Sequence, residues 1–261
     1  MAFSMDGIII DRIQYGIAED FSGNILYTLT QLADATINIT AESKDAVDKD
    51  GTLIKRFYTG KSGTFEANNA IVDFNILAAG TGTSKAVATN ANSIVMPGIM
   101  TVAAGTTSVT LNNLVADSVQ VVGIASNGTK VTDYTLATAA SATEFAVSNT
   151  TLTLPTDTVP ANFVVKYNRT VTSGVKVVNK ADEFPGTIKL TLKALAIDTC
   201  SPDVVRSVYI VLPSFQVSPE TSLSLTTDAQ LSYNGDLQVS YCGSDGKVLY
   251  EIYFAEDDVE A

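Results

Sequence analysis

The chain has 261 residues, of which 46% are hydrophobic and 17% are charged, and this composition is typical of a folded globular protein. Its formal net charge is −12, which disfavours tight binding to nucleic acid phosphates, since such binding needs a basic face. The sequence contains no histidine, which excludes Ser-His-Asp and Cys-His nucleophile systems and most zinc and iron sites. We therefore expect a protein that is not an enzyme and that needs no cofactor or metal.

The N-terminal segment has an apolar patch at residues 7–10, but Asp6, Asp11 and Arg12 flank it closely. A basic n-region and a small-residue cleavage site are missing, so the segment does not resemble a secretion signal. No apolar run approaches the ~20 residues that a membrane-spanning helix needs. We expect the protein to stay in the cytoplasm until it is assembled.

The chain has two cysteines, Cys200 and Cys242. Two cysteines without histidine cannot form a four-ligand zinc site. We expect two free thiols in the core, with a disulfide as the alternative if the fold brings the two residues together.

Strand patterns begin early in the chain. Residues 25–40 are rich in leucine, isoleucine and threonine, and the stretch Thr36–Thr40 alternates strictly between apolar and polar residues. This alternation predicts a half-buried strand.

A charged stretch follows at residues 42–61, with an Asp50–Gly51 turn signal in its middle. We predict a protruding hairpin or long arm; an ordinary solvated hairpin is the alternative. Both signs of charge stand beside large apolar residues there, which is the mixture that protein interfaces use. The residues predicted to contact another subunit are Lys44, Asp48, Asp50, Leu53, Ile54, Lys55, Arg56, Phe57 and Tyr58.

One segment departs from the strand pattern. In residues 68–79, Ile71, Phe74 and Ala78 recur at helical spacing, and Gly80 follows. This spacing predicts a short amphipathic helix packed on a sheet. A strand is the alternative, because residues 72–76 also alternate.

The composition changes between Gly80 and Pro160, where charged residues become rare and Thr, Ser, Ala, Val and Asn dominate. Short strand patterns recur there, and Asn127–Gly128 is a strong hairpin signal. We predict an inserted small β-sandwich joined by a linker over residues 80–93. Its expected strands are residues 108–111, 118–122, 144–147, 151–154 and 163–167.

The last third of the chain predicts an antiparallel meander that ends in an acidic, solvated tail at residues 256–260. Turns are expected at Asn234–Gly235 and at Asp245–Gly246. The expected strands are residues 187–193, 204–212, 222–225, 237–241 and 248–254.

Four segments in this order resemble a bacteriophage major tail protein with an inserted immunoglobulin-like domain. They are residues 63–70, which lead into the predicted helix, 173–185, 208–213 and 247–253. The resemblance implies an all-β fold, with a tail-tube-type β-sandwich or half-barrel, one short helix and an inserted immunoglobulin-like β-sandwich. The tube core would comprise residues 1–80 and 171–261, and the insert residues 81–170.

The resemblance also implies a function, that of a tail tube subunit in the virion. Such subunits form stacked rings, usually hexameric, whose sheets join edge to edge around a lumen, and a long hairpin contacts the neighbouring ring. The partners would be copies of the chain itself, other tail proteins, and DNA that passes through the lumen without specific binding during genome ejection.

A DNA conduit should have a neutral or acidic inner wall, because each inward lysine would add a phosphate contact in every subunit. The candidates for the lumen are the polar residues that alternate with apolar ones in two regular segments. They are Thr36, Asn38, Thr40, Asp236, Gln238 and Ser240.

Two other functions remain open. A second virion role, in head decoration, at the neck or on the capsid, also suits an all-β chain. A carbohydrate-binding adhesin module is the third possibility, although such sites usually use stacked aromatic residues, and the insert has few. Its aromatic residues are Tyr134, Phe145, Phe163 and Tyr167.

Overall fold

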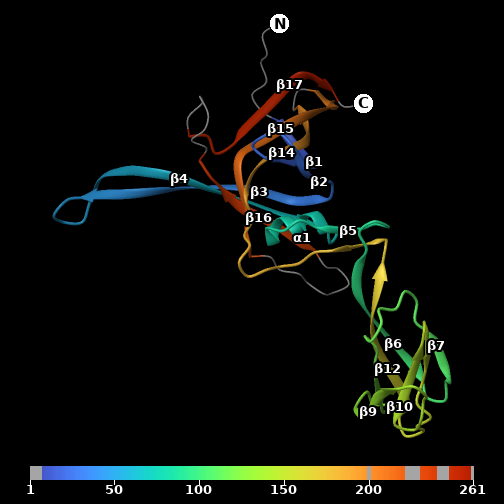
Figure 1. Ribbon diagram of the computed structural model, residues 1–261. Helices are drawn as coiled ribbons and strands as arrows, with labels where there is room; N and C mark the ends of the chain where they lie inside the picture. The colour runs from blue at the N-terminus through green and yellow to red at the C-terminus, as the bar shows by residue number, and fades with distance from the viewer. Residues whose placement is uncertain (1–7, 199–200, 221–229, 240–246, 260–261) are drawn as a thin grey trace. The chain divides into compact units, whose positions relative to one another are not determined.

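The computed structural model describes residues 8–198, 201–220, 230–239 and 247–259 (Figure 1). The described chain consists mainly of antiparallel strands and one short helix, which confirms the predicted all-β class. It divides into two compact units. The first unit comprises Met1–Lys85 and Val177–Ala261, and the second comprises Ala86–Lys176.

The first unit is built on one eight-stranded sheet with the order β2-β1-β14-β15-β16-β4-β3, in which β17 also pairs with β15. Every pairing in this sheet is antiparallel. The strands are β1 (Ile8–Glu19), β2 (Ile25–Leu29), β3 (Leu32–Val47), β4 (Leu53–Asn69), β14 (Thr187–Asp198), β15 (Ser201–Val217), β16 (Leu231–Leu237) and β17 (Glu251–Val259).

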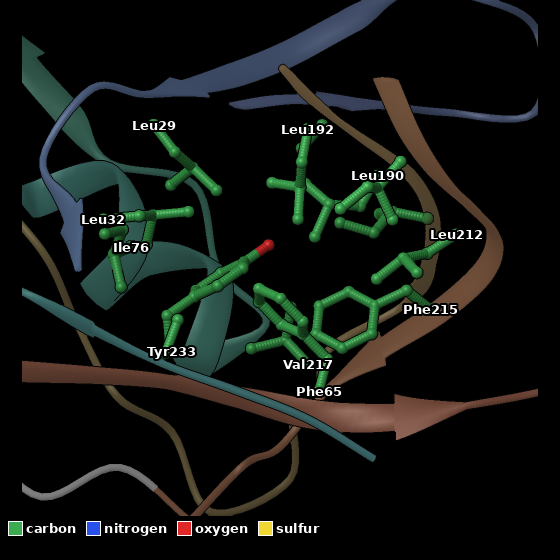
Figure 2. Packing of buried hydrophobic residues seen from close by; sticks show 14 of the residues in the cluster. Leu29, Leu32, Phe65, Ile76, Leu190, Leu192, Leu212, Phe215, Val217 and Tyr233 are labelled. Atoms are coloured by element: carbon green, nitrogen blue, oxygen red, sulfur yellow. The ribbon is translucent and has the colours of Figure 1, made fainter. Parts of the chain in front are cut away.

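The sheet of the first unit curls around a single hydrophobic core (Figure 2). The rings of Phe65 and Phe215 meet edge to face at 5.7 Å, and Tyr233 packs against both. The hydroxyl of Tyr233 lies 2.8 Å from the hydroxyl of Tyr27 on β2. Burial raises the pKa of Tyr27 to about 12, so both hydroxyls stay protonated at neutral pH and join β2 to β16 by a hydrogen bond.

Helix α1 (Phe74–Thr81) confirms that a helix exists in the predicted region. The carboxylate of Asp73 accepts a hydrogen bond of 2.6 Å from the backbone N–H of Asn75 and caps the first turn. Gly82 ends the helix in the left-handed region, with φ of +70°. Ile76 and Ala78 are apolar side chains of this helix that pack into the interior, and both are buried.

The predicted limits of this helix were wrong. Asn68 and Asn69 belong to β4, because they pair with Ser232 and Leu231 of β16. Ile71 precedes the helix and is 54% exposed, so it is not part of the buried face. Gly80, predicted to end the helix and open a linker, lies within the helix. The cap at Asp73 sets the true beginning, and periodicity alone does not reveal it.

The predicted turn at Asn234–Gly235 was also wrong, because both residues lie inside β16. Gly235 pairs with Phe65 of β4 and with Val217 of β15. A Cβ atom at Gly235 would lie 2.2 Å from the carbonyl oxygen of Gln216. The glycine therefore permits close strand approach and does not mark a turn. Four other predicted features lie outside the described residues. They are Cys200, Cys242, the strand at 222–225 and the turn at Asp245–Gly246.

The second unit contains a seven-stranded arrangement with the order β6-β12-β8-β9-β10-β11-β7, in which only β9 and β10 run parallel. These strands are β6 (Ile94–Ala103), β7 (Ser108–Thr110), β8 (Gln120–Ile124), β9 (Lys130–Ala137), β10 (Glu144–Ser148), β11 (Thr151–Thr153) and β12 (Asn162–Val171). Two short strands pair with each other, β5 (Ala86–Ala88) and β13 (Gly174–Lys176).

The second unit has its own core, centred on Phe163, Val165 and Leu152. Its β8–β9 hairpin confirms the turn at Asn127–Gly128, where Gly128 has φ of +82° and the Asn127 side chain accepts a hydrogen bond from Thr129. That residues 81–170 form an immunoglobulin-like insert stays a prediction.

In the described parts of the chain, no helix is long and apolar enough to cross a membrane. Among the same residues, no group of three or more acidic, cysteine or histidine side chains is arranged to hold a metal ion.

Candidate assembly surfaces

Strands β3 and β4 continue beyond the sheet as a two-stranded ribbon, which we call the arm (residues 42–61; Figure 1). Pairing of β4 with β16 ends at Gly63, so the arm residues pair with one another. At the tip, the Asp48 carboxylate accepts hydrogen bonds from the backbone N–H groups of Asp50 and Thr52, at 2.9 and 2.8 Å. Gly51 takes φ of +83°. The predicted hairpin and its turn are confirmed.

The arm has two chemically different faces, because directly opposed residues of paired strands point to the same side. The lysine face carries Leu53, Lys55 and Phe57, with Lys44 opposite Phe57. The Lys55 ammonium lies 5.0 Å from the centroid of the Phe57 ring. This face is therefore both apolar and cationic.

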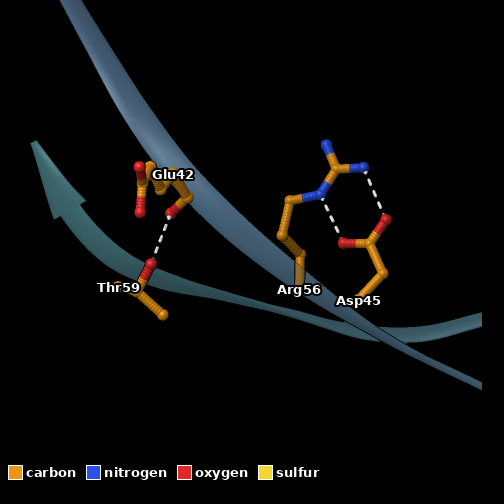
Figure 3. A network of polar contacts seen from close by, with 4 residues as sticks. All are labelled: Glu42, Asp45, Arg56 and Thr59. Atoms are coloured by element: carbon orange, nitrogen blue, oxygen red, sulfur yellow. Dashed lines mark hydrogen bonds and ion pairs between the residues drawn. The ribbon is translucent and has the colours of Figure 1, made fainter.

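The arginine face carries Ile54, Arg56 and Tyr58, with Asp45 opposite Arg56. Arg56 donates two hydrogen bonds to the Asp45 carboxylate, at 2.7 and 2.9 Å (Figure 3). The guanidinium lowers the pKa of Asp45, which keeps the pair ionised. Nearer the base, the Thr59 hydroxyl contacts the Glu42 carbonyl at 3.4 Å. The arginine face is therefore apolar with its charges neutralised.

The apolar side chains of the arm are open to solvent on both faces. Leu53, Ile54, Phe57 and Tyr58 are 51%, 69%, 50% and 71% exposed. An isolated two-stranded hairpin is at best marginally stable in water, and an ion pair between exposed side chains adds little stability. The exposed apolar surface therefore marks the arm as a surface that another molecule can cover.

A second surface, which we call the polar face, lies on the side of β3, β4 and β16 that points away from the core. The register places Asn38, Thr64 and Asp236 in one row across these three strands. Gln216 on β15 and Thr187 on β14 continue the same row. The predicted lumen candidates from two distant segments therefore meet on one surface.

The other candidates lie beside this row. Thr36 is opposite Glu66, and the Thr40 hydroxyl lies 2.8 Å from that of Ser62. Gln238 donates to Gln216 and accepts a hydrogen bond of 3.3 Å from Thr187. Ser240 lies outside the described residues. Whether the polar face lines a lumen stays a prediction, as does the role of the arm between subunits.

Sequence reasoning missed several members of the polar face, including Thr64, Glu66 and Gln216. A signal was present for the first two, because Thr64 and Glu66 alternate with the buried Phe65 and Ala67. Gln216 gave a weaker signal, since a bulge interrupts the register between β14 and β15 near it.

The charge of the polar face is acidic on β3, β4 and β16. Residues 36–40, 62–68 and 232–238 include Glu66 and Asp236 and no basic residue. Further along the sheet, Lys189 on β14 lies 3.6 Å from Glu19 on β1 and forms an ion pair with it.

Among the described strands of the first unit, β2 and β3 stand at the two ends of the strand order and form the edges of the sheet. A free edge presents unpaired backbone N–H and C=O groups, which are a template for pairing with another chain. The β3 edge borders the polar face at Thr36, Asn38 and Thr40. Edge pairing between copies would therefore extend the polar face from one chain to the next.

The curled sheet with its edge strands, the polar face and the projecting arm define an all-β protein with surfaces suited to association with other chains. Residues 8–250 match the YomU/Tube protein family, and the chain belongs to this family. The family is one of phage tail tube proteins, which gives the chain a structural role in the tail of the virion. A search of curated proteins finds no match to the chain.

Proposed function

We propose that the protein is the repeating subunit of a phage tail tube, in which hexameric rings stack around a channel for genome ejection. The observation that carries this proposal is the polar face, which reaches β3 at one end of the strand order and has no basic residue in residues 36–40, 62–68 and 232–238. Pairing of this edge with the sheet of a neighbouring copy makes one continuous inner wall and removes the exposed edges.

The arm supplies the contact between rings in this proposal. It extends beyond the sheet and carries apolar and charged side chains together, as interfaces do. Ring contacts through a projecting ribbon leave the polar face uncovered, so that the channel wall and the stacking contact use different parts of β3 and β4.

Electron microscopy of the purified chain in negative stain tests the proposal directly. We expect stacked rings or tubes with a central channel. Isolated trimers or rings without stacking would instead favour another structural role in the virion, at the head or neck. Monomers that bind sugars on a glycan array would favour an adhesin module.

The charge of the channel gives a second prediction. The double variant Asn38→Lys, Asp236→Lys should still form tubes, because both side chains are exposed on the polar face. The variant tubes should retain duplex DNA that wild-type tubes release, because the duplex carries one charge per ~1.7 Å and each subunit adds two lysines to the wall. Co-sedimentation of short duplex DNA with assembled tubes measures this retention.

The matched control places the same change of charge on the second unit. Ser126→Lys with Asp133→Lys alters two exposed positions near the β8–β9 hairpin. We expect these control tubes to release DNA as the wild type does. Equal retention by both variants would show that DNA binds by overall charge and that the polar face is not the channel wall.

The second unit should be dispensable for assembly. Deletion of residues 93–168, closed by a short Gly-Ser bridge, should leave tubes that are thinner on the outside. Ile94 pairs with Val171, so the two chain ends that the deletion leaves, Asn92 and Arg169, lie within reach of a short bridge. The core of the first unit contains no residue of the deleted segment. Failure of the shortened chain to fold, seen by circular dichroism, would contradict this prediction.

A further inference from the structure

The first unit has an apolar groove of about 270 Å³ on the core side of its sheet. Its lining includes Ile10 and Ile13 of β1, Ile39 of β3, and Tyr250 and Ile252 near the start of β17, and contains no charged residue. Helix α1 contacts β2 and β16, which contribute nothing to the groove. Among the described residues, no helix therefore covers the mouth of the curled sheet there.

The groove is large enough for an aromatic ring together with an aliphatic side chain. An engineered apolar cavity of about 150 Å³ binds benzene, so the larger groove accepts more than one ring. Ile10, Tyr250 and Ile252 are 49%, 40% and 54% exposed. Covering such surface contributes about 25 cal/mol per Å² of apolar area. The groove therefore suits an apolar occupant.

The lysine face of the arm has the matching chemistry. Leu53 and Phe57 lie four residues apart on β4, on the same side of the ribbon. Both are half exposed and have no polar atom in the side chain. Tyr58, on the arginine face, carries a hydroxyl that would lose its contact with water in a wholly apolar groove.

The arm cannot fill the groove of its own chain. Ile39 lines the groove, and Phe57 pairs with Lys44, five residues further along β3. At the rise of a strand, Phe57 lies ~17 Å beyond Ile39 on a ribbon that runs away from the groove. An arm that fills the groove must therefore belong to a second copy.

The arm and the chain as a whole carry opposite net charges. The arm holds five basic and four acidic residues, a net charge of +1 in a chain whose net charge is −12. Glu251 stands next to the lining residue Ile252 in the sequence, whereas Asp11, next to Ile10, forms an ion pair of 3.2 Å with Arg12. The lysine face therefore approaches an acidic molecule, which favours and orients the encounter.

We propose that the lysine face of the arm docks in the apolar groove of a second copy, with Leu53 and Phe57 buried and Lys44 and Lys55 at the rim of the groove. This assignment rests on the proposed tube function and identifies the surface that the arm binds. The contact joins two different patches, so each copy offers one arm and one groove, and the contact repeats from copy to copy.

Thiol cross-linking tests the contact in the full-length chain. In a Cys200→Ser, Cys242→Ser background, Leu53→Cys with Ile252→Cys should give a ladder of linked multimers after assembly and treatment with a short thiol cross-linker. The matched control, Ile54→Cys with Ile252→Cys, moves the thiol to the arginine face and should stay monomeric on a denaturing gel.

A second pair of variants tests the groove without a cross-linker. Ile252→Glu should abolish tubes while the unfolding temperature of the monomer is unchanged, because the side chain is 54% exposed. Ile71→Glu, at a position with the same 54% exposure outside the groove, should leave tubes intact.

Other outcomes overturn the assignment. Cross-links within one chain would show that the arm folds back on its own groove. Another segment or partner covers the groove if wild-type tubes form, the Leu53→Cys, Ile252→Cys variant gives no cross-links and Ile252→Glu assembles normally. If the wild type forms no tubes but the Leu53→Cys, Ile252→Cys variant is cross-linked between chains, the docking stands and the tube function fails.

Discussion

Replacement of both Lys55 and Arg56 by glutamate is expected to leave a folded monomer that forms no tubes. The two residues stand on opposite faces of the arm, so the change lowers the charge of each face by two units. Arg56 also loses its two hydrogen bonds to Asp45, and the new carboxylate repels it. Every arm side chain involved is exposed, so the fold of the first unit should be unaffected. Sedimentation measures assembly, and circular dichroism measures folding.

The matched control for the arm reverses two lysines elsewhere. Lys130→Glu with Lys166→Glu makes the same change in net charge on exposed strands of the second unit. We expect this variant to assemble as the wild type does. Normal tubes from the arm variant would mean that the arm is a solvated hairpin without a role in assembly.

The largest loss of stability is expected from Gly235→Val. A Cβ atom there lies 2.2 Å from the Gln216 carbonyl oxygen and 2.6 Å from the Phe215 ring. The backbone oxygen cannot rotate away, so β16 must separate from β15 at the centre of the core. We expect a loss of more than about 4 kcal/mol in the free energy of unfolding, measured by urea titration.

Gly60→Val is the control for this substitution, since a Cβ at Gly60 meets no atom within 4 Å. Its free energy of unfolding should stay within about 0.5 kcal/mol of the wild type. A similarly small effect at Gly235 would contradict the close packing of β16 against β15.

The elements that sequence patterns predicted well are those fixed by local chemistry. The hairpin at Asp50–Gly51 follows from turn residues that bond to their own backbone, and the alternation at Thr36–Thr40 follows from one buried face. The turn predicted at Asn234–Gly235 failed because the same residue pair can serve packing. There the glycine allows the backbone of β15 to approach closely. This contact forms only in the folded sheet, so the local sequence does not indicate it.

The candidate surface was predictable in part for the same reason. Alternation indicates which residues of one strand share a face, so Asn38 and Asp236 were found separately. That Thr64 lies between them depends on the order of β3, β4 and β16, which are far apart in the sequence. The groove depends on still more distant pairings, because its lining draws on both ends of the chain.

The way in which the arm is anchored has a mechanical consequence. A pull on its tip runs along two covalent backbones, parallel to the strands, and does not peel one strand from the other. Where β4 enters the sheet, it is bonded to β3 on one side and to β16 on the other. Ladder hydrogen bonds lie across this direction, so tension loads many of them in shear at once. When force is applied at its tip, the arm therefore resists being pulled out of the sheet, because its hydrogen bonds cannot break one at a time.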